Sequence, residues 1–233
     1  MGIYSILEKL RKCERKVFTT NDIAITAMLN NNSARVYVNR MIKKGLLKKV
    51  ETGKYTISDD PFIVASQLIS PSYISFFTAF YLLRLIPQEV TKITIATSKR
   101  KKPIKVLGMP VEFIQIKKSM MFGFRKTRTI PGSSYLMLAE PEKAVVDALY
   151  RPGSVPISYL KDIIKMLDIK KLEEYILRTE SEAVLRRVGF LLDNCGISHS
   201  LKPKSKNTYF LNPKIHRKGK LDKKWRLYVN EVI

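Results

Sequence analysis

The stretch SARVYVNRMIKKGLLKKVETGKYTI, residues 33–57, changes its apolar periodicity halfway along. From Ala34 to Ile42 the apolar side chains recur at helical spacing, and Gly45 suits the end of that helix. Beyond Gly45 the apolar side chains alternate on both sides of the turn sequence ETGK (51–54), which is typical of two short strands. The stretch therefore predicts a helix followed directly by a hairpin.

Two further helices are predicted upstream. Apolar residues at positions 3, 6, 7 and 10 follow the i, i+3, i+4, i+7 spacing of one helix face. Thr20 is the predicted cap of a second helix, with Ile23, Ala27 and Met28 on its apolar side. Three helices and a basic hairpin in this order are typical of a winged helix-turn-helix domain, which binds DNA.

Basic residues run through both halves of the opening stretch. Ser33 is the predicted cap of the third helix. The predicted DNA-binding residues are Ser33, Arg35, Val36, Asn39, Arg40, Lys43 and Lys44 on the helix, and Lys48, Lys49 and Lys54 on the hairpin. In a major groove Asn39 would pair with adenine, Arg35 or Arg40 with guanine, and Val36 would touch a thymine methyl, whereas the lysines suit phosphates. Two alternatives remain open: a winged helix that contacts protein, and a solvated charged face.

The charge balance favours a polyanionic partner. The 233 residues include 43 Lys and Arg against 20 Asp and Glu, a net charge of +23. Such self-repulsion is typical first of proteins that bind nucleic acid and second of proteins at anionic membranes. A general enrichment in lysine is the alternative explanation of the net charge. Cys13 and Cys195 match no metal or disulfide spacing. The longest apolar run (73–83) is too short to span a bilayer. The N-terminus lacks the basic, apolar and small residues in the order typical of a signal peptide. We expect a cytoplasmic protein with no membrane partner.

The acidic pair before Pro61 marks the predicted end of the first domain, because proline disfavours a helix immediately before it. We expect an α+β fold: a winged helix-turn-helix domain over 1–60 and a larger C-terminal domain over 61–233. In the second domain we predict helices over 62–69 and 73–86, a mixed sheet up to about 138, and mainly helix over about 139–233. Aromatic residues in the basic tail predict that it packs.

Catalytic signatures are sparse. His199 and His216 are the only histidines, and neither has a second metal ligand at the usual spacing. Glu112, Asp147 and Asp162 stand alone in the sequence, and no phosphate-binding glycine loop is recognisable. We predict no catalytic residue, no metal site, no cofactor and no enzymatic activity. A nucleic-acid-processing enzyme whose acids meet only in three dimensions is the alternative.

Two basic clusters lie outside the first predicted domain. Lys99-Arg100-Lys101-Lys102 separates two predicted strands, and residues 214–226 hold much of the basic tail. Each cluster is either a solvated loop or a further contact with DNA, RNA or a partner protein.

Six stretches carry a resemblance to a known family. They are GLLKKVETGKYTI (45–57), SPSYISFFTAFYLLRLIP (70–87), VTKITIAT (90–97), LAEPEKAVVDALYRP (138–152), RRVGFLLDNCGI (186–197) and KWRLYVN (224–230). In this order and spacing they resemble the AbiEi antitoxins of type IV toxin-antitoxin systems, over nearly the whole chain.

The resemblance implies two functions. The winged helix would bind inverted repeats in double-stranded promoter DNA and repress its own operon. The larger domain would counteract an AbiEii-like nucleotidyltransferase toxin, with no need for a stable complex. Glu142, Lys143 and Asp147 match a recurring E-K…D pattern of the family, although a helix whose polar residues hold the domain together explains them equally well. A DNA-binding regulator with no toxin partner is the alternative.

Overall fold

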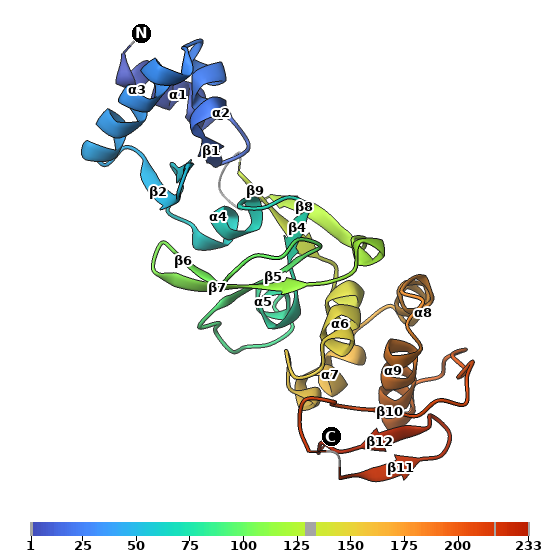
Figure 1. The fold of residues 1–233 in the computed structure, drawn as a ribbon. Helices are drawn as coiled ribbons and strands as arrows, with labels where there is room; N and C mark the ends of the chain where they lie inside the picture. The colour runs from blue at the N-terminus through green and yellow to red at the C-terminus, as the bar shows by residue number, and fades with distance from the viewer. Residues whose placement is uncertain (1, 129–133, 217, 233) are drawn as a thin grey trace. The chain divides into compact units, whose positions relative to one another are not determined.

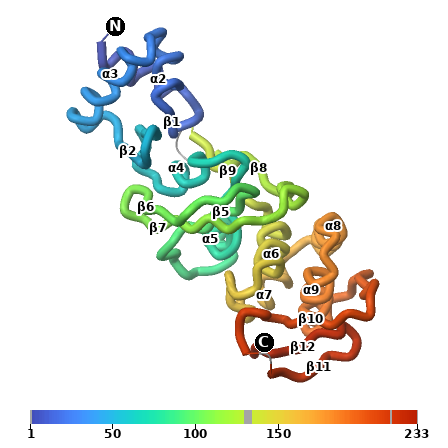
Figure 2. Tube along the Cα trace, viewed as in Figure 1, coloured from blue at the N-terminus to red at the C-terminus, as the bar shows by residue number. Residues whose placement is uncertain are grey.

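A computed structural model describes residues 2–128, 134–216 and 218–232 (Figure 1). Helices and sheets alternate through this part of the chain, so the expected mixture of α and β structure is confirmed. The chain forms two compact units, each made of three separate segments. Figure 2 traces the chain with a colour for each residue number, from blue at the N-terminus to red at the C-terminus. The first unit comprises Met1–Ile74, Thr91–Gln115 and Arg125–Leu138, and the second comprises Ser75–Val90, Ile116–Phe124 and Ala139–Ile233. The first unit thus contains the predicted 1–60 domain together with most of the large sheet.

The first unit begins with three helices and a small sheet. In chain order the elements are α1 (Ile3–Lys12), β1 (Val17–Thr19), α2 (Thr20–Ala27), α3 (Asn31–Lys43), β2 (Lys48–Glu51) and β3 (Lys54–Thr56). The strands are antiparallel in the order β1-β3-β2. A shared core of Ile6, Leu10, Ile23, Val38 and Met41 confirms the predicted apolar sides of the helices.

The starts of α2 and α3 differ from the prediction. Thr19, not Thr20, caps α2, because its hydroxyl accepts a hydrogen bond from the amide of Asp22 (3.1 Å). The Asp22 carboxylate in turn accepts from the amide of Thr19 (2.7 Å), which completes a capping box. Asn30 caps α3 by accepting from the amide of Ser33 (2.8 Å), so Ser33 lies inside the first turn.

The end of α2 also differs. Met28 was expected on its apolar side, but the helix has ended at Ala27 and Met28 adopts a left-handed conformation with a φ of 54°. Its side chain is 86% exposed. Helical spacing would have placed Met28 on the buried side, but it does not apply to a residue beyond the end of the helix.

The large sheet follows α4 (Pro61–Gln67). Its strands are β4 (Ser72–Ile74), β5 (Ile93–Thr97), β6 (Ile104–Val106), β7 (Met109–Gln115), β8 (Phe124–Arg128) and β9 (Tyr135–Ala139), in the order β6-β7-β5-β4-β9-β8. The pairs β5–β7 and β4–β9 are parallel, and β4–β5 and β6–β7 are antiparallel. The predicted helix over 73–86 is wrong at its start, because Ile74 pairs with Ile95 and Leu138 in the middle of this sheet. A fully buried strand and a buried helix have the same apolar pattern over a few residues.

The second unit is helical before it ends in a small sheet. Its elements are α5 (Phe76–Leu82), the 3-10 helix η1 (Lys118–Met120), α6 (Pro141–Tyr150), α7 (Ile157–Ile164), α8 (Ile169–Arg178), α9 (Glu182–Asn194), β10 (Tyr209–Phe210), β11 (Lys220–Asp222) and β12 (Leu227–Val229). The expectation of mainly helix therefore holds up to Asn194. Beyond it the described residues form loops and three short strands in the order β10-β12-β11.

The basic tail packs, as its aromatic residues predict. Trp225 is 1% exposed and lies directly over Gly189 of α9, where any larger side chain would meet the indole ring. The buried guanidinium of Arg186 donates to the carbonyls of Ser205 (2.5 Å) and Asn207 (2.5 Å). Among the described residues, no helix combines the length and apolarity needed to cross a membrane.

Candidate nucleic-acid interface

Helix α3 buries one side and exposes the other. Ala34, Val38 and Met41 are at most 2% exposed. The predicted base-contacting residues Arg35, Val36, Asn39 and Arg40 lie on the opposite side and are all exposed, as is Lys43, which was predicted to contact phosphate. The structure therefore brings them together on one solvent-facing surface of a single helix.

Every charged residue on this exposed side of α3 is basic. The helix contains no Asp or Glu. The Arg40 guanidinium lies 5.9 Å from the centre of the Tyr37 ring, and the Lys44 ammonium lies 5.9 Å from that of Tyr4. Contacts with aromatic faces hold a cation in place without neutralising it. The positive charge of this face is therefore available to an anionic ligand.

A glycine turn connects α3 to the hairpin. Gly45 has a φ of 68°, a conformation that favours glycine. Its amide donates to the carbonyl of Ile42 (2.9 Å), and the amide of Leu46 donates to the carbonyl of Met41 (2.9 Å). These two bonds form a Schellman motif, which satisfies the last helical carbonyls and redirects the chain into β2.

The hairpin lysines have different surroundings. Lys49 is exposed, and exposed Lys48 forms an ion pair with Asp59. Lys54 is half-buried, because its ammonium lies 2.7 Å from the Glu51 carboxylate and donates to the carbonyl of Leu68 (2.6 Å). Lys54 thus has an internal role that its position in the sequence did not indicate, and a phosphate contact for it stays a prediction.

Glu51 is the one acidic residue within residues 33–57. Its two carboxylate oxygens are bound separately, one by Lys54 (2.7 Å) and the other by Lys101 (2.5 Å) from the loop after β5. Burial raises the pKa of Glu51, but the hydrogen bonds and charges of Lys101 and Lys54 outweigh burial and leave the pKa below its ordinary value. Glu51 therefore stays ionised and is neutralised by two lysines, one of them distant in sequence.

Side-chain contacts join the helical part of the first unit to its large sheet. Buried Gln67 on α4 accepts from the amide of Lys16 (2.7 Å) and donates to the carbonyl of Tyr135 (2.7 Å). Lys126 on β8 forms an ion pair with Glu14. Sequence reasoning missed these contacts, since their partners are between 51 and 112 residues apart and share no periodic pattern.

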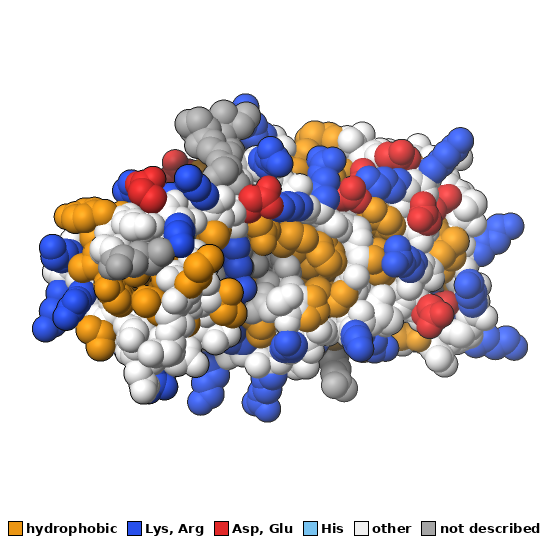
Figure 3. All heavy atoms as spheres, turned by 90° about the horizontal axis from the view of Figure 1, so that it is seen from above, with side chains coloured by type: hydrophobic (Ala, Val, Ile, Leu, Met, Phe, Trp, Pro, Cys, Tyr) orange, Lys and Arg blue, Asp and Glu red, His pale blue; other side chains and the backbone are white. Residues whose placement is uncertain are grey.

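The two additional basic clusters differ in surroundings. In the first, Lys99, Arg100 and Lys102 are exposed, whereas Lys101 is half-buried, with its ammonium 5.4 Å from the centre of the Phe113 ring. In the second, Lys214, Lys218, Lys220, Lys223 and Arg226 are exposed, Lys224 pairs with Asp193, and Arg217 lies outside the described residues. Figure 3 shows Lys and Arg side chains spread over the face in view, with fewer Asp and Glu between them.

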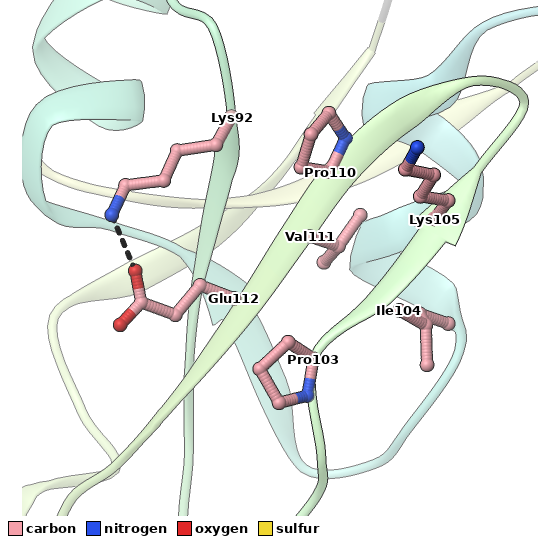
Figure 4. Close-up of a pocket in the computed structure, with 7 residues that line it drawn as sticks. All are labelled: Lys92, Pro103, Ile104, Lys105, Pro110, Val111 and Glu112. Atoms are coloured by element: carbon pink, nitrogen blue, oxygen red, sulfur yellow. Dashed lines mark hydrogen bonds and ion pairs between the residues drawn. The ribbon is translucent and has the colours of Figure 1, made fainter.

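A shallow groove of about 460 Å³ lies over β6 and β7 (Figure 4). Its lining is mostly apolar and includes Pro103, Ile104, Pro110 and Val111. Lys92 points toward Glu112 at its rim, and their charged groups lie 2.6 Å apart. Glu112, one of the acids considered for catalysis, is therefore part of a surface ion pair.

Asp147, a second such acid, is fully buried in α6 of the second unit. It forms an ion pair with Lys143, and its other oxygen accepts from the hydroxyl of Ser75 (2.7 Å). Burial lowers the pKa of Lys143, against the charge of Asp147, which raises it. Asp162 is exposed and pairs with Lys165 (3.2 Å). Across the described ranges, no three His, Cys, Asp or Glu side chains are placed to hold a metal ion.

Comparison with known proteins reveals a shared fold and no match in sequence. No protein-family model matches this chain, and no curated protein matches it. The crystal structure of the RV2827C protein from Mycobacterium tuberculosis is similar, with a TM-score of 0.58 and 15% sequence identity, over 95% of this chain and 89% of that chain. A likeness at this identity establishes a common fold and carries no function with it.

Proposed function

We propose that this protein is a cytoplasmic, DNA-binding autorepressor and antitoxin, and that residues 1–60 form a winged helix-turn-helix domain. The observation that carries the proposal is the basic, solvent-facing side of α3, followed at once by the β2–β3 hairpin. In this assignment α3 enters the major groove and the hairpin is the wing that contacts the adjacent backbone.

The spacing of the exposed residues supports base contacts. Val36 and Lys43 are seven positions apart, which corresponds to about 10 Å along a helix. Base pairs follow one another about every 3.4 Å, so this face spans about three of them. Asn39 and Arg40 lie in the middle of that span and have the side chains that pair with adenine and guanine.

The antitoxin part of the proposal rests on the sequence resemblance. The AbiEi-like stretches continue far beyond residue 60, with LAEPEKAVVDALYRP as the most characteristic. We therefore assign DNA binding to the first 60 residues and the neutralisation of an AbiEii-like nucleotidyltransferase toxin to the larger part of the chain. The alternative, a regulator without a toxin, predicts that no such toxin gene adjoins its own.

A binding titration tests the DNA-binding part. The full chain should shift a duplex taken from upstream of its own gene, and hold it more tightly than a scrambled duplex of equal length. Its affinity should fall steeply with salt, because phosphate contacts release counterions. Equal affinity for both duplexes, or affinity that salt does not change, would contradict sequence-specific binding.

A growth assay tests the antitoxin part. The chain should restore the growth of cells that express the neighbouring nucleotidyltransferase-like gene. The variant Asn39→Ala/Arg40→Ala should rescue growth equally well, since the proposed neutralising function lies outside α3. Specific DNA binding without growth rescue would favour the stand-alone regulator.

A further inference from the structure

We infer that the loop Lys99–Lys102 is a second phosphate-contacting element, attached to the wing by the ion pair between Lys101 and Glu51. The inference rests on the proposed DNA binding and extends it to the large sheet, outside the three-helix region. Both parts belong to the first compact unit, so their contacts are those of one body.

Lys101 has the surroundings of a positioning residue. Its side chain is 17% exposed, binds the Glu51 carboxylate at 2.5 Å and lies over the Phe113 ring. Glu51 begins the turn of the wing, where an unpaired carboxylate would repel phosphates. Lys101 and Lys54 together remove that repulsion, so the wing can approach DNA.

The neighbours of Lys101 are the contacting residues. Lys99, Arg100 and Lys102 are exposed, and none of them forms an ion pair within the described part of the chain. Four residues span at most about 13 Å, so all three cations lie close to the wing. Phosphates follow one another about every 3.4 Å along the axis on each strand, so a loop of this length can face several of them.

Duplex DNA explains this arrangement better than a protein partner. The loop adds charge of the same sign as exposed Lys48 and Lys49, at the place where the wing would meet the backbone. The neighbouring groove over β6 and β7 is mainly apolar, and the acid at its rim is already paired with Lys92. The ion pair between Lys101 and Glu51 thus places the exposed charges of the loop beside the wing.

The test compares two double variants of the full chain. Lys99→Gln/Lys102→Gln removes two exposed charges from the loop, and Lys117→Gln/Lys118→Gln removes two exposed charges elsewhere. We expect the loop variant to bind the upstream duplex several-fold more weakly, with the slope of log K against log salt reduced by about 1 to 2 and base preference unchanged. The control should match the wild type, and Lys99→Arg/Lys102→Arg should retain affinity.

Phosphate-ethylation interference gives a second readout. The wild type should need phosphates beyond those of the wing, and the loop variant should no longer need them. An unchanged salt slope and unchanged interference pattern in the loop variant would overturn the inference. Weaker growth rescue with unchanged DNA binding would overturn it too, in favour of a protein contact.

Failure of sequence-specific repression and failure of the loop contact give different results. If the wild type binds scrambled and upstream duplexes equally, specific repression is wrong. The loop is still tested with the scrambled duplex, because phosphate contacts do not depend on sequence.

A double-mutant cycle tests the role of Lys101. If Lys101 acts by neutralising Glu51, Lys101→Met should lower DNA affinity in the wild type but much less in the Glu51→Gln variant. If Lys101 itself contacts a phosphate, the loss should be equal in both backgrounds. An equal loss would overturn the attachment through Glu51.

Discussion

Asn39 and Arg40 are neighbours on the exposed side of α3 and have different partners in the proposed complex. Replacing either residue with alanine should cost about 1–3 kcal/mol of binding free energy and relax base preference at one position. Lys49→Ala should weaken all duplexes alike and reduce the salt slope by about 1. Titrations against the upstream duplex and its single-base variants measure both effects. Equal losses on every duplex for Asn39→Ala would contradict a base contact.

Lys143 and Asp147 form a fully buried ion pair, and the hydroxyl of Ser75 donates a hydrogen bond to Asp147. Lys143→Met leaves an unpaired charge in the core, so we expect a loss of about 3–5 kcal/mol in the free energy of unfolding. Lys143→Met/Asp147→Leu should recover most of that loss, since it removes both charges. Urea unfolding measures these values, with exposed Lys165→Met as the control. A single variant as stable as the control would contradict a structural role for the pair.

This pair also bears on the E-K…D pattern of the resemblance. Glu142, Lys143 and Asp147 are all buried. A carboxylate oxygen of Glu142 accepts from the amide of Asp168 (3.3 Å) at the start of α8. The geometry favours the interpretation in which these polar residues hold the second unit together.

At the scale of elements, the caps of α2 and α3 are set by Thr19 and Asn30. Thr19→Ala and Asn30→Ala should each lower the free energy of unfolding by about 1 kcal/mol, because each leaves an amide without its acceptor. The matched controls are Thr20→Ala, one residue after Thr19, and Ser33→Ala, three residues after Asn30. Each control should lower the free energy of unfolding by less than the cap variant does. Chemical denaturation of the four variants measures their free energies of unfolding. Controls that cost as much as the caps would contradict this assignment.

The C-terminal sheet is attached to α9 through Asp193. Its carboxylate accepts from the indole of Trp225 (2.6 Å) and pairs with Lys224 and His199. Burial raises the pKa of Asp193, but these hydrogen bonds and the Lys224 charge outweigh it and leave the pKa below its ordinary value. A lowered folded-state pKa adds stability that is present above the unfolded value and is lost as the pH falls through the folded value.

Trp225 is the only tryptophan, so its fluorescence reports on this contact. We expect a red shift of its emission only once the pH falls below the range in which an ordinary aspartate titrates, because the lowered pKa delays protonation of the Asp193 carboxylate. Asp193→Ala should show a red shift already at neutral pH. The exposed Asp162→Ala variant is the control and should behave as the wild type does. An acid-induced shift that is the same with and without the Asp193 carboxylate would disprove the assignment.

At the scale of the molecule, a net charge of +23 opposes the compact state, and a bound polyanion should relieve that opposition. Duplex DNA at a hundred times its dissociation constant should stabilise the part that binds it by about 2.7 kcal/mol. Calorimetry with the upstream duplex should therefore show a higher melting temperature. The gain should be smaller with a scrambled duplex of equal length, and with the variant Asn39→Ala/Arg40→Ala. An unchanged melting temperature at saturating DNA would contradict the proposal.

Prediction from sequence succeeded where the signal is local and periodic. The apolar sides of α1 and α3 and the glycine turn after α3 follow from spacing or backbone preference. It failed for Tyr73 and Ile74, which form a strand, because an apolar run that is buried on all sides has no period to distinguish strand from helix. The caps were misplaced by one and three residues, since several adjacent polar residues can serve as acceptors.

The sequence by itself determined the mixed α and β content, the basic side of α3 and the excess of positive charge. These properties are sums or short-range periodicities, which do not depend on the path of the chain. Only the tertiary structure placed Lys101 against Glu51, Ser75 against Asp147 and Gln67 between Lys16 and Tyr135. Such contacts join residues about 50 to 70 positions apart, so they exist only once the sheets and helices have brought distant segments together.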